Sequence, residues 1–138
     1  MKEYKNFPGV YYERKGRKKY LYTKNLVPGK KVYGENLIIR QGEEYRSWDI
    51  RRSKLGAAII KNISHIGVKK GDYVLYLGAS TGTTPSHISD IVGKEGFVFA
   101  LDFAPRVVRD LVFLCENRKN MTPILADATQ PKKFMHLI

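Results

Sequence analysis

Two kinds of hydrophobic pattern divide the chain. Between about residue 9 and residue 46, short runs rich in aromatic and β-branched residues are separated by turn sequences such as LVPGKK and RQGEE. The runs are GVYYERK, KYLYTKN and ENLIIR. Short apolar runs bounded by glycine and proline are typical of strands, so we expect a small antiparallel sheet in this part of the chain.

After Ser47 the apolar positions take on helical spacing. They are Ile50, Leu55, Ala58, Ile59 and Ile63. Recurrence every three or four residues predicts a helix with one apolar face. We expect this helix to link the sheet to the rest of the chain.

From Gly71 onward, predicted strands and helices alternate. We predict strands at 73–77, 97–102 and 123–126, with helices from Pro85 to about 92 and from Pro105 to about 117. Alternation at this spacing is typical of right-handed βαβ units on a parallel sheet, so the predicted class is α/β. The predicted domains are a basic β-rich N-terminal domain (1–46), a linking helix and loop (47–70), and a parallel α/β domain (71–138).

All of the net charge of +12 lies in the first half of the chain. Residues 1–70 hold 18 lysines and arginines against 6 acidic residues, whereas the remainder holds 7 of each. A concentrated basic surface attracts a polyanion through counterion release, which favours nucleic-acid binding, although a lysine-rich surface can also serve solubility alone. No apolar run approaches the roughly 20 residues that cross a bilayer, and we expect no membrane partner.

The loop LGASTGTTP follows the first predicted strand of the parallel sheet. Ligands of such sheets bind beyond the carboxyl ends of the strands. Gly78 and Gly82 tolerate positive φ and would let the backbone approach a ligand closely. Thr84 and Pro85 are expected to cap and begin the next helix, whose free N–H groups favour an anion. An ordinary tight turn is the alternative interpretation of the glycines.

Acidic residues follow the other two predicted strands. Asp102 ends VFALD, where a carboxylate can accept hydrogen bonds from both hydroxyls of a ribose, and Asp127 follows the third strand in PILADA. The loop and the two acids together predict a nucleoside-containing ligand at one edge of the sheet. The residues leave both NAD and S-adenosylmethionine open, and the GxxxG spacing departs from the GxGxxG of NAD sites.

Six ordered motifs resemble the fibrillarin family, in particular its archaeal form. They are NLVPGKKVYGE, EEYRSWD, RSKLGAAI, LYLGASTGTTPSHISDI, LDFAPRVVRDL and PILADATQP. The resemblance implies a Rossmann-like class I methyltransferase core and an S-adenosylmethionine-dependent RNA 2′-O-methyltransferase, located in the cytoplasm. It implies action on ribosomal and transfer RNA within box C/D particles. The implied partners are a box C/D guide RNA, the substrate RNA, the C/D scaffold protein and a kink-turn-binding ribosomal-type protein, with no DNA.

The resemblance also assigns roles to individual residues. Thr83 and Thr84 would contact the methionine end of the cofactor. The remaining cofactor contacts would come from Gly78, Ala79, Asp102, Phe103, Asp127 and Ala128. Lys54, in RSKLG, matches the first lysine of the family's catalytic set, and an amine there can orient a ribose hydroxyl or stabilise its developing negative charge.

Several residues are expected to have simpler roles. Arg51 and Arg52 are predicted to contact RNA or to lie on the surface. His87 and His136 have no ligand partners at suitable spacing, so both are predicted to be structural and no metal site is expected. Cys115 lies in an apolar run and is predicted to be a small core residue.

The resemblance covers only the first three strands of a seven-stranded methyltransferase sheet. The family's other catalytic residues would lie beyond Ile138, so we expect a truncated chain or one half of a split protein, with its first parallel strand at an open edge. A binding module that lacks methyl transfer is therefore one alternative function. A nucleotide-dependent oxidoreductase is another.

Overall fold

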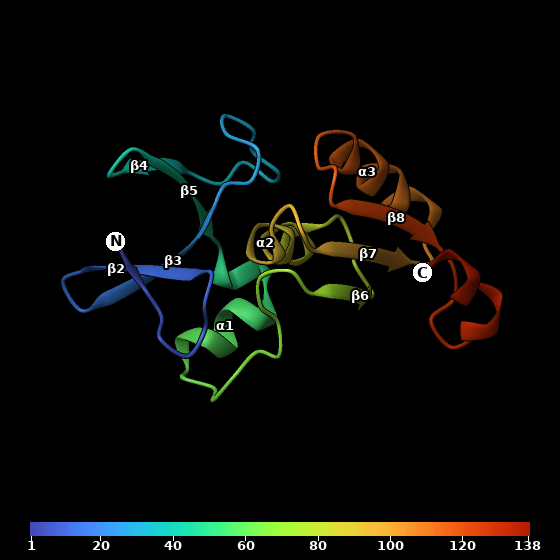
Figure 1. The fold of residues 1–138 in the computed structure, drawn as a ribbon, viewed down its shortest axis with the longest axis horizontal. Coiled ribbons are helices and arrows are strands. Elements are labelled where there is room, and N and C mark those ends of the chain that lie inside the picture. Colours follow the sequence, from blue (N-terminus) through green and yellow to red (C-terminus); the bar gives the residue numbers. More distant parts are fainter.

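The structure, a computed structural model, describes residues 1–138 and contains two sheets (Figure 1). The first is antiparallel, with strand order β1-β2-β3-β5-β4. Its strands are β1 (Lys2–Glu3), β2 (Val10–Lys15), β3 (Lys18–Lys24), β4 (Leu37–Arg40) and β5 (Glu43–Trp48). The predicted antiparallel sheet is therefore confirmed.

The β4–β5 hairpin differs from the prediction, which placed only a turn at RQGEE. The turn is limited to Gln41 and Gly42, both with positive φ (53° and 79°), and β5 begins directly after it. Two residues of positive φ suit the tight turn of a hairpin. β5 looks polar in sequence because one of its fully buried positions is Arg46.

The predicted linking helix is broken into two short pieces. A 3₁₀ turn spans Ile50–Arg52 and α1 spans Lys54–Ile60. Ser53 separates them, because its backbone is extended (φ −145°, ψ 111°) and its Oγ accepts a hydrogen bond from the Gly56 N–H at 3.1 Å. A serine in this position caps a helix and fixes where it begins. Lys54 is consequently the first residue of α1.

The second sheet is parallel, as predicted, and its strand order is β6-β7-β8. Its strands are β6 (Tyr73–Leu77), β7 (Phe97–Asp102) and β8 (Met121–Leu125), and its crossover helices are α2 (Thr83–Val92) and α3 (Pro105–Glu116). Both helices pack on one face, where Val98 and Ala100 of β7 meet Val92 and Leu111 in a buried cluster. None of the helices has the length and apolar character needed to cross a membrane.

The opposite face of the parallel sheet is only partly covered. Short 3₁₀ turns at Pro131–Lys133 and Met135–Leu137 place Phe134 against Leu101 and Ile124. The side chains on this face of β6 remain exposed, and β6 has a strand neighbour on one side only. These side chains are Tyr73, Leu75 and Leu77. The expected open edge of the first parallel strand is confirmed.

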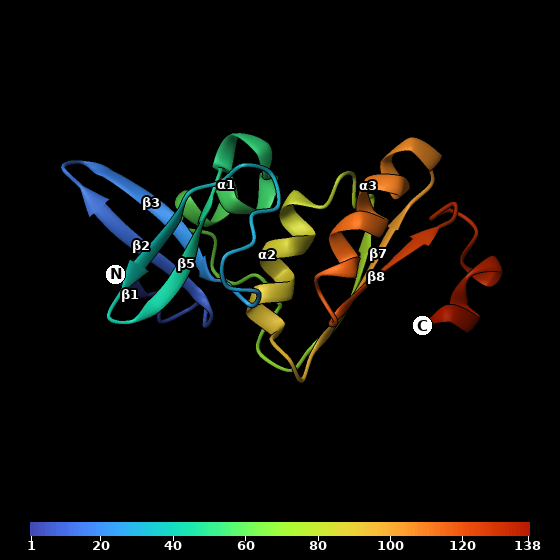
Figure 2. The same ribbon diagram turned by 90° about the horizontal axis from the view of Figure 1, so that it is seen from above.

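Helix α2 lies between the two sheets and contacts both (Figures 1 and 2). Ile88 and Val92 pack into the cluster of the parallel sheet, whereas Ile91 packs with Trp48 in the cluster of the antiparallel sheet. Because its apolar residues point both ways, α2 is buried along most of its length. The two sheets are therefore joined through one helix.

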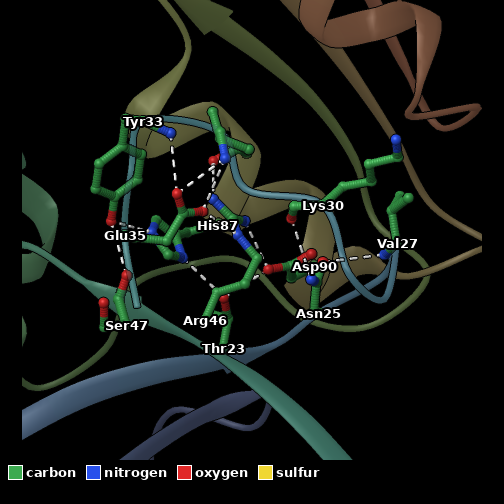
Figure 3. A network of polar contacts seen from close by, with 12 residues as sticks. Thr23, Asn25, Val27, Lys30, Tyr33, Glu35, Arg46, Ser47, His87 and Asp90 are labelled. Carbon is green, nitrogen blue, oxygen red and sulfur yellow. Dashed lines mark hydrogen bonds and ion pairs between the residues drawn. The ribbon is translucent and has the colours of Figure 1, made fainter. Parts of the chain in front are cut away.

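Buried charges reinforce this junction (Figure 3). Arg46 donates to Glu35 at 2.6 Å and to Asp90 of α2 at 2.8 Å, and Arg118 donates to Asp90 at 2.7 Å. We call these four residues the buried charge cluster. Two arginines face two carboxylates, which compensates the cost of removing each charge from water.

His87 of α2 lies beside this cluster, stacked on Trp48 at a ring separation of 4.6 Å. Its Nδ1 lies 2.7 Å from Thr23 Oγ1 and its Nε2 lies 2.8 Å from the Tyr33 hydroxyl. Thr23 donates its proton to Asp90, so Nδ1 carries the proton donated to Thr23. Burial, together with the nearby Arg46 and Arg118 guanidinium groups, lowers the pKa of His87 well below its ordinary value. His87 is a neutral structural residue here, as predicted.

Candidate functional site

The loop between β6 and α2 is held against the end of β7. The N–H groups of Gly78 and Ala79 both donate to the Leu101 carbonyl at 2.9 Å. Gly78 has φ of 77°, and no atom lies within 4 Å of the position that a Cβ would occupy there. The backbone at Gly78 is thus bare and open, as expected where a ligand approaches closely.

Gly82 has a different environment from the one predicted. Its φ is 98°, and a Cβ there would overlap Leu114 and lie 3.1 Å from Leu111 Cδ2. Both leucines belong to α3. Gly82 therefore permits close packing of the loop on a helix, and its closest neighbours are protein side chains.

The start of α2 also differs from the prediction, which placed the cap at Thr84 and the first helical residue at Pro85. The helix begins at Thr83 with Gly82 in the capping position, so Thr84 and Pro85 are its second and third residues rather than its cap. The N–H groups of Thr83 and Thr84 have no hydrogen-bond acceptor within the protein, and Pro85 has no N–H. Two free donors at the positive end of a helix can bind a carboxylate.

Asp102, at the end of β7, is tied to the loop. Its Oδ2 accepts from the Ser80 N–H at 2.9 Å and its Oδ1 from the Ala104 N–H at 3.1 Å. The carboxylate is half-buried, and each oxygen keeps acceptor capacity for a further donor. The next residue, Phe103, is 73% exposed, which leaves an aromatic face available beside the carboxylate.

Asp127 follows β8 in the same row of strand ends. The Ala126 N–H donates to the Asp102 carbonyl at 3.1 Å, which fixes the two strand ends relative to each other. Asp127 itself accepts from the Thr129 N–H and hydroxyl at 2.9 and 2.7 Å. These hydrogen bonds hold the pKa of the Asp127 carboxyl below its usual value. A charged, fixed turn thus follows β8, with exposed Ala128 within it.

Lys54 lies exposed at the start of α1 and is linked indirectly to the loop. Ser53, the residue before it, accepts a hydrogen bond from the buried Thr84 hydroxyl at 2.8 Å. The start of the helix that carries Lys54 is thereby joined to the start of α2. The role of Ser53 is not among the sequence-based predictions, although a serine just before an apolar run is a recognised capping signal.

The two neighbouring arginines are on the surface. Arg51 is paired with Asp49 at 3.1 Å, while Arg52 lies 3.8 Å from the same carboxylate and over the Tyr33 ring. Cys115 is half-buried, and burial raises its pKa to about 11, so the thiol stays protonated. No group of three or more potential metal ligands is present.

Comparisons with known proteins agree on one family. The family model for fibrillarin matches residues 1–138. The chain is 57% identical over 134 residues to the fibrillarin-like rRNA/tRNA 2′-O-methyltransferase of Thermococcus onnurineus, and 48% identical over 139 residues to that of Aeropyrum pernix. The match covers 96% of this chain and 59% of the first relative, and 100% and 60% for the second. The chain thus spans about three fifths of the length of these relatives.

Solved structures give the same result. Aeropyrum pernix fibrillarin, in complex with natively bound S-adenosyl-L-methionine, superposes with a TM-score of 0.94 at 47% identity, covering 99% of this chain and 60% of that one. Fibrillarin in a complex with Nop5p superposes with a TM-score of 0.80 at 37% identity, covering 99% and 59%.

Proposed function

The chain belongs to the fibrillarin family, and from this premise we propose that it binds S-adenosylmethionine and serves the 2′-O-methylation of RNA. The observation that carries the proposal is the row of strand ends at β6, β7 and β8. Within this row the open backbone of Gly78, the free N–H groups that begin α2, and the Asp102 carboxylate lie on connected segments. A relative that is 57% identical to this chain is named a fibrillarin-like rRNA/tRNA 2′-O-methyltransferase.

The residues of this edge fit the chemical groups of the cofactor. The N–H groups of Thr83 and Thr84 would receive its carboxylate, and Asp102 would accept from its ribose hydroxyls. Phe103 offers an apolar face for the adenine, and the chain around Asp127 and Ala128 offers polar atoms for the adenine edge. When bound, S-adenosylmethionine supplies an activated methyl group.

Lys54 is the residue we propose to act on the target ribose. An ammonium group can orient a 2′-hydroxyl and stabilise the negative charge that develops on its oxygen. Positioning of this kind accounts for much of the catalysis when the methyl donor is already activated. The exposed position of Lys54, beside a helix start joined to α2, allows it to reach a bound RNA.

We propose a scaffold protein and RNA as the partners. The relative in complex with Nop5p supports a protein partner for this fold. A box C/D guide RNA and a kink-turn-binding protein are proposed on the family relationship alone. Arg51 and Arg52, which flank the proposed catalytic lysine, are proposed RNA contacts.

Calorimetry with S-adenosylmethionine tests the cofactor site. Asp102→Asn removes the charge that would bind the ribose, and we expect an affinity loss of about 10- to 100-fold, as for loss of charge-assisted hydrogen bonds. Asp110→Asn, an exposed change of the same kind on α3, is the matched control and should bind as the unchanged chain does. Equal affinities for all three proteins, or tighter binding of NAD, would refute the site.

Transfer of labelled methyl groups to a guided RNA tests the reaction. With the scaffold protein, the guide RNA and the C-terminal part of a relative's methyltransferase domain supplied, we expect transfer with the unchanged chain and none with Lys54→Ala, while cofactor affinity stays within about twofold. Cofactor and RNA binding without any transfer by the unchanged chain would instead support a binding module.

A further inference from the structure

A groove runs between helix α3 and the long loop that joins β3 to β4. The first of its two cavities has a volume of about 500 Å³, and its lining includes Lys30, Lys31, Arg52 and Phe113. A second cavity of about 510 Å³, with Lys94 and Lys119 in its lining, adjoins the first at Val27 and Asn117. We call these two adjoining cavities the basic groove.

The loop that forms one wall of the basic groove has a fixed shape. Carboxylates behind it bind its backbone: Asp90 accepts from the Leu26 N–H at 3.0 Å, Glu44 from the Gly29 N–H at 2.6 Å, and Glu35 from the Val32 N–H at 2.9 Å. These three carboxylates therefore bind the backbone of the loop, and none of them pairs with its lysines. The loop presents its lysines outward, and Figure 3 shows Lys30 extending away from the buried network.

The cations of the basic groove are largely uncompensated. Lys30, Lys31, Lys94 and Lys119 are exposed, and none has a carboxylate within 4.0 Å. Asp110 is the single acidic residue in the lining of either cavity. Unpaired lysines along a preformed depression attract a polyanion, because counterions are released when phosphates replace them.

The first cavity borders the segments that carry the proposed methyl-transfer site. Thr81, in the loop that would hold the cofactor, lines it together with Arg52, which lies two residues before Lys54. Phe113, 61% exposed, provides an aromatic surface in the same wall. Exposed aromatic rings in a cationic channel are typical of sites that bind single strands.

We propose that the basic groove binds the sugar-phosphate backbone of the RNA strand that continues from the target nucleotide. This inference rests on the proposed function for the identity of the polyanion. The direct connection to the cofactor loop and the exposed ring favour RNA over an acidic protein segment, for which lysines alone would suffice. Lys30, Lys31 and Arg52 would bind the phosphates nearest the target, and Lys94 and Lys119 those farther along.

Fluorescence anisotropy with a single-stranded RNA of about 20 nucleotides tests the groove at salt concentrations from roughly 50 to 200 mM. The variant Lys30→Gln/Lys31→Gln removes two phosphate contacts. We expect the slope of log affinity against log salt to fall in magnitude by about 1.4, because a single-strand contact contributes about 0.7. Lys94→Gln/Lys119→Gln should have a similar effect.

The matched control is Arg17→Gln/Lys18→Gln, which removes two exposed charges at the β2–β3 turn, away from the groove (Figure 1). It should leave the slope unchanged. An equal loss in this control, an unchanged slope in the groove variants, or binding of polyglutamate as tight as RNA through the same lysines would overturn the proposal. Calorimetry with S-adenosylmethionine on the same variants separates this outcome from failure of the cofactor site, because the groove lysines are not proposed to contact the cofactor.

Discussion

Gly78 and Gly82 share a left-handed backbone conformation but have different neighbours. The position of a Cβ is open at Gly78 and filled by α3 leucines at Gly82. A side chain at Gly78 would therefore occupy the space proposed for the cofactor, whereas one at Gly82 would displace a helix. Glycine is therefore required at these two positions for different reasons: space for a ligand at Gly78 and close packing on α3 at Gly82.

Alanine at each glycine should separate these causes. We expect Gly78→Ala to lower the free energy of unfolding by about 1 kcal/mol, from backbone strain, and to reduce S-adenosylmethionine affinity strongly. Gly82→Ala adds a steric clash, so its stability loss should be larger, about 2 to 4 kcal/mol. Urea denaturation and calorimetry measure the two quantities, and equal stability losses at the two positions would contradict the assignment.

His87 should make the stability of the protein depend on pH. Its pKa is well below 6.5 in the fold, so the unfolded chain binds the proton more readily and acid favours unfolding. We expect the free energy of unfolding to be fully retained above about pH 6.5 and to fall by up to about 1.4 kcal/mol per pH unit as the pH drops below it.

The comparison that isolates His87 is the His87→Gln variant. It should be less stable at every pH, because the stack on Trp48 is lost, yet its stability should vary less between about pH 6.5 and pH 5. Denaturant titrations at these two pH values provide the measurement. The same pH dependence in both proteins would assign it to other groups.

At the scale of elements, the junction between α1 and α2 depends on one hydroxyl. Ser53 Oγ caps α1 through the Gly56 N–H and accepts from the Thr84 hydroxyl of α2. A change in either helix start is thus transmitted to the other. This junction joins the segment that carries Lys54 to the segment that would bind the cofactor.

A double-mutant cycle measures this junction. Ser53→Ala should cost about 1 to 2 kcal/mol of stability, as expected for loss of a helix cap and of a buried acceptor, and Thr84→Val about 1 kcal/mol. Together they should cost less than their sum by at least about 0.5 kcal/mol, because they remove the same hydrogen bond. Additive losses in thermal or urea unfolding would argue that the two hydroxyls act independently.

The strands and helices that could be predicted from the sequence are those determined by neighbouring residues. The apolar runs of β6 and β7 are bounded by glycines and acids, so their limits and their parallel arrangement could be predicted, as could the meeting of Gly78 and Asp102 at one edge. β5 was missed because its buried Arg46 depends on acids distant in sequence. The helix break at Ser53 was also missed, because the apolar spacing continues through Ser53 while its side chain caps a new helix. The hydrogen bond between Ser53 and Thr84 joins residues 31 positions apart, which no local pattern indicates.

At the scale of the whole molecule, the buried charge cluster makes the interface between the sheets sensitive to single substitutions. Arg46 lies fully buried between Glu35 and Asp90. Removing its charge leaves two carboxylates with one arginine in a region that water does not reach. The cost of such an unpaired charge exceeds the benefit of the original pair.

Methionine substitutions test this sensitivity. Arg46→Met should lower the free energy of unfolding by about 3 to 5 kcal/mol. Arg40→Met breaks a surface pair between Arg40 of β4 and Glu13 of β2 and should have a far smaller effect. Urea denaturation of both variants provides the comparison, and similar losses would show that the cluster contributes no more than a surface pair.

The buried charge cluster also determines how the chain can be divided. Its members come from residues 35 to 118, and a cut anywhere between β5 and β6 would separate Arg46 from Asp90. Each fragment would then contain charged side chains of the cluster whose partners of opposite charge lie on the other fragment. The antiparallel and parallel regions, which look like two domains in sequence, should consequently melt in a single cooperative transition, and neither should be an autonomous folding unit.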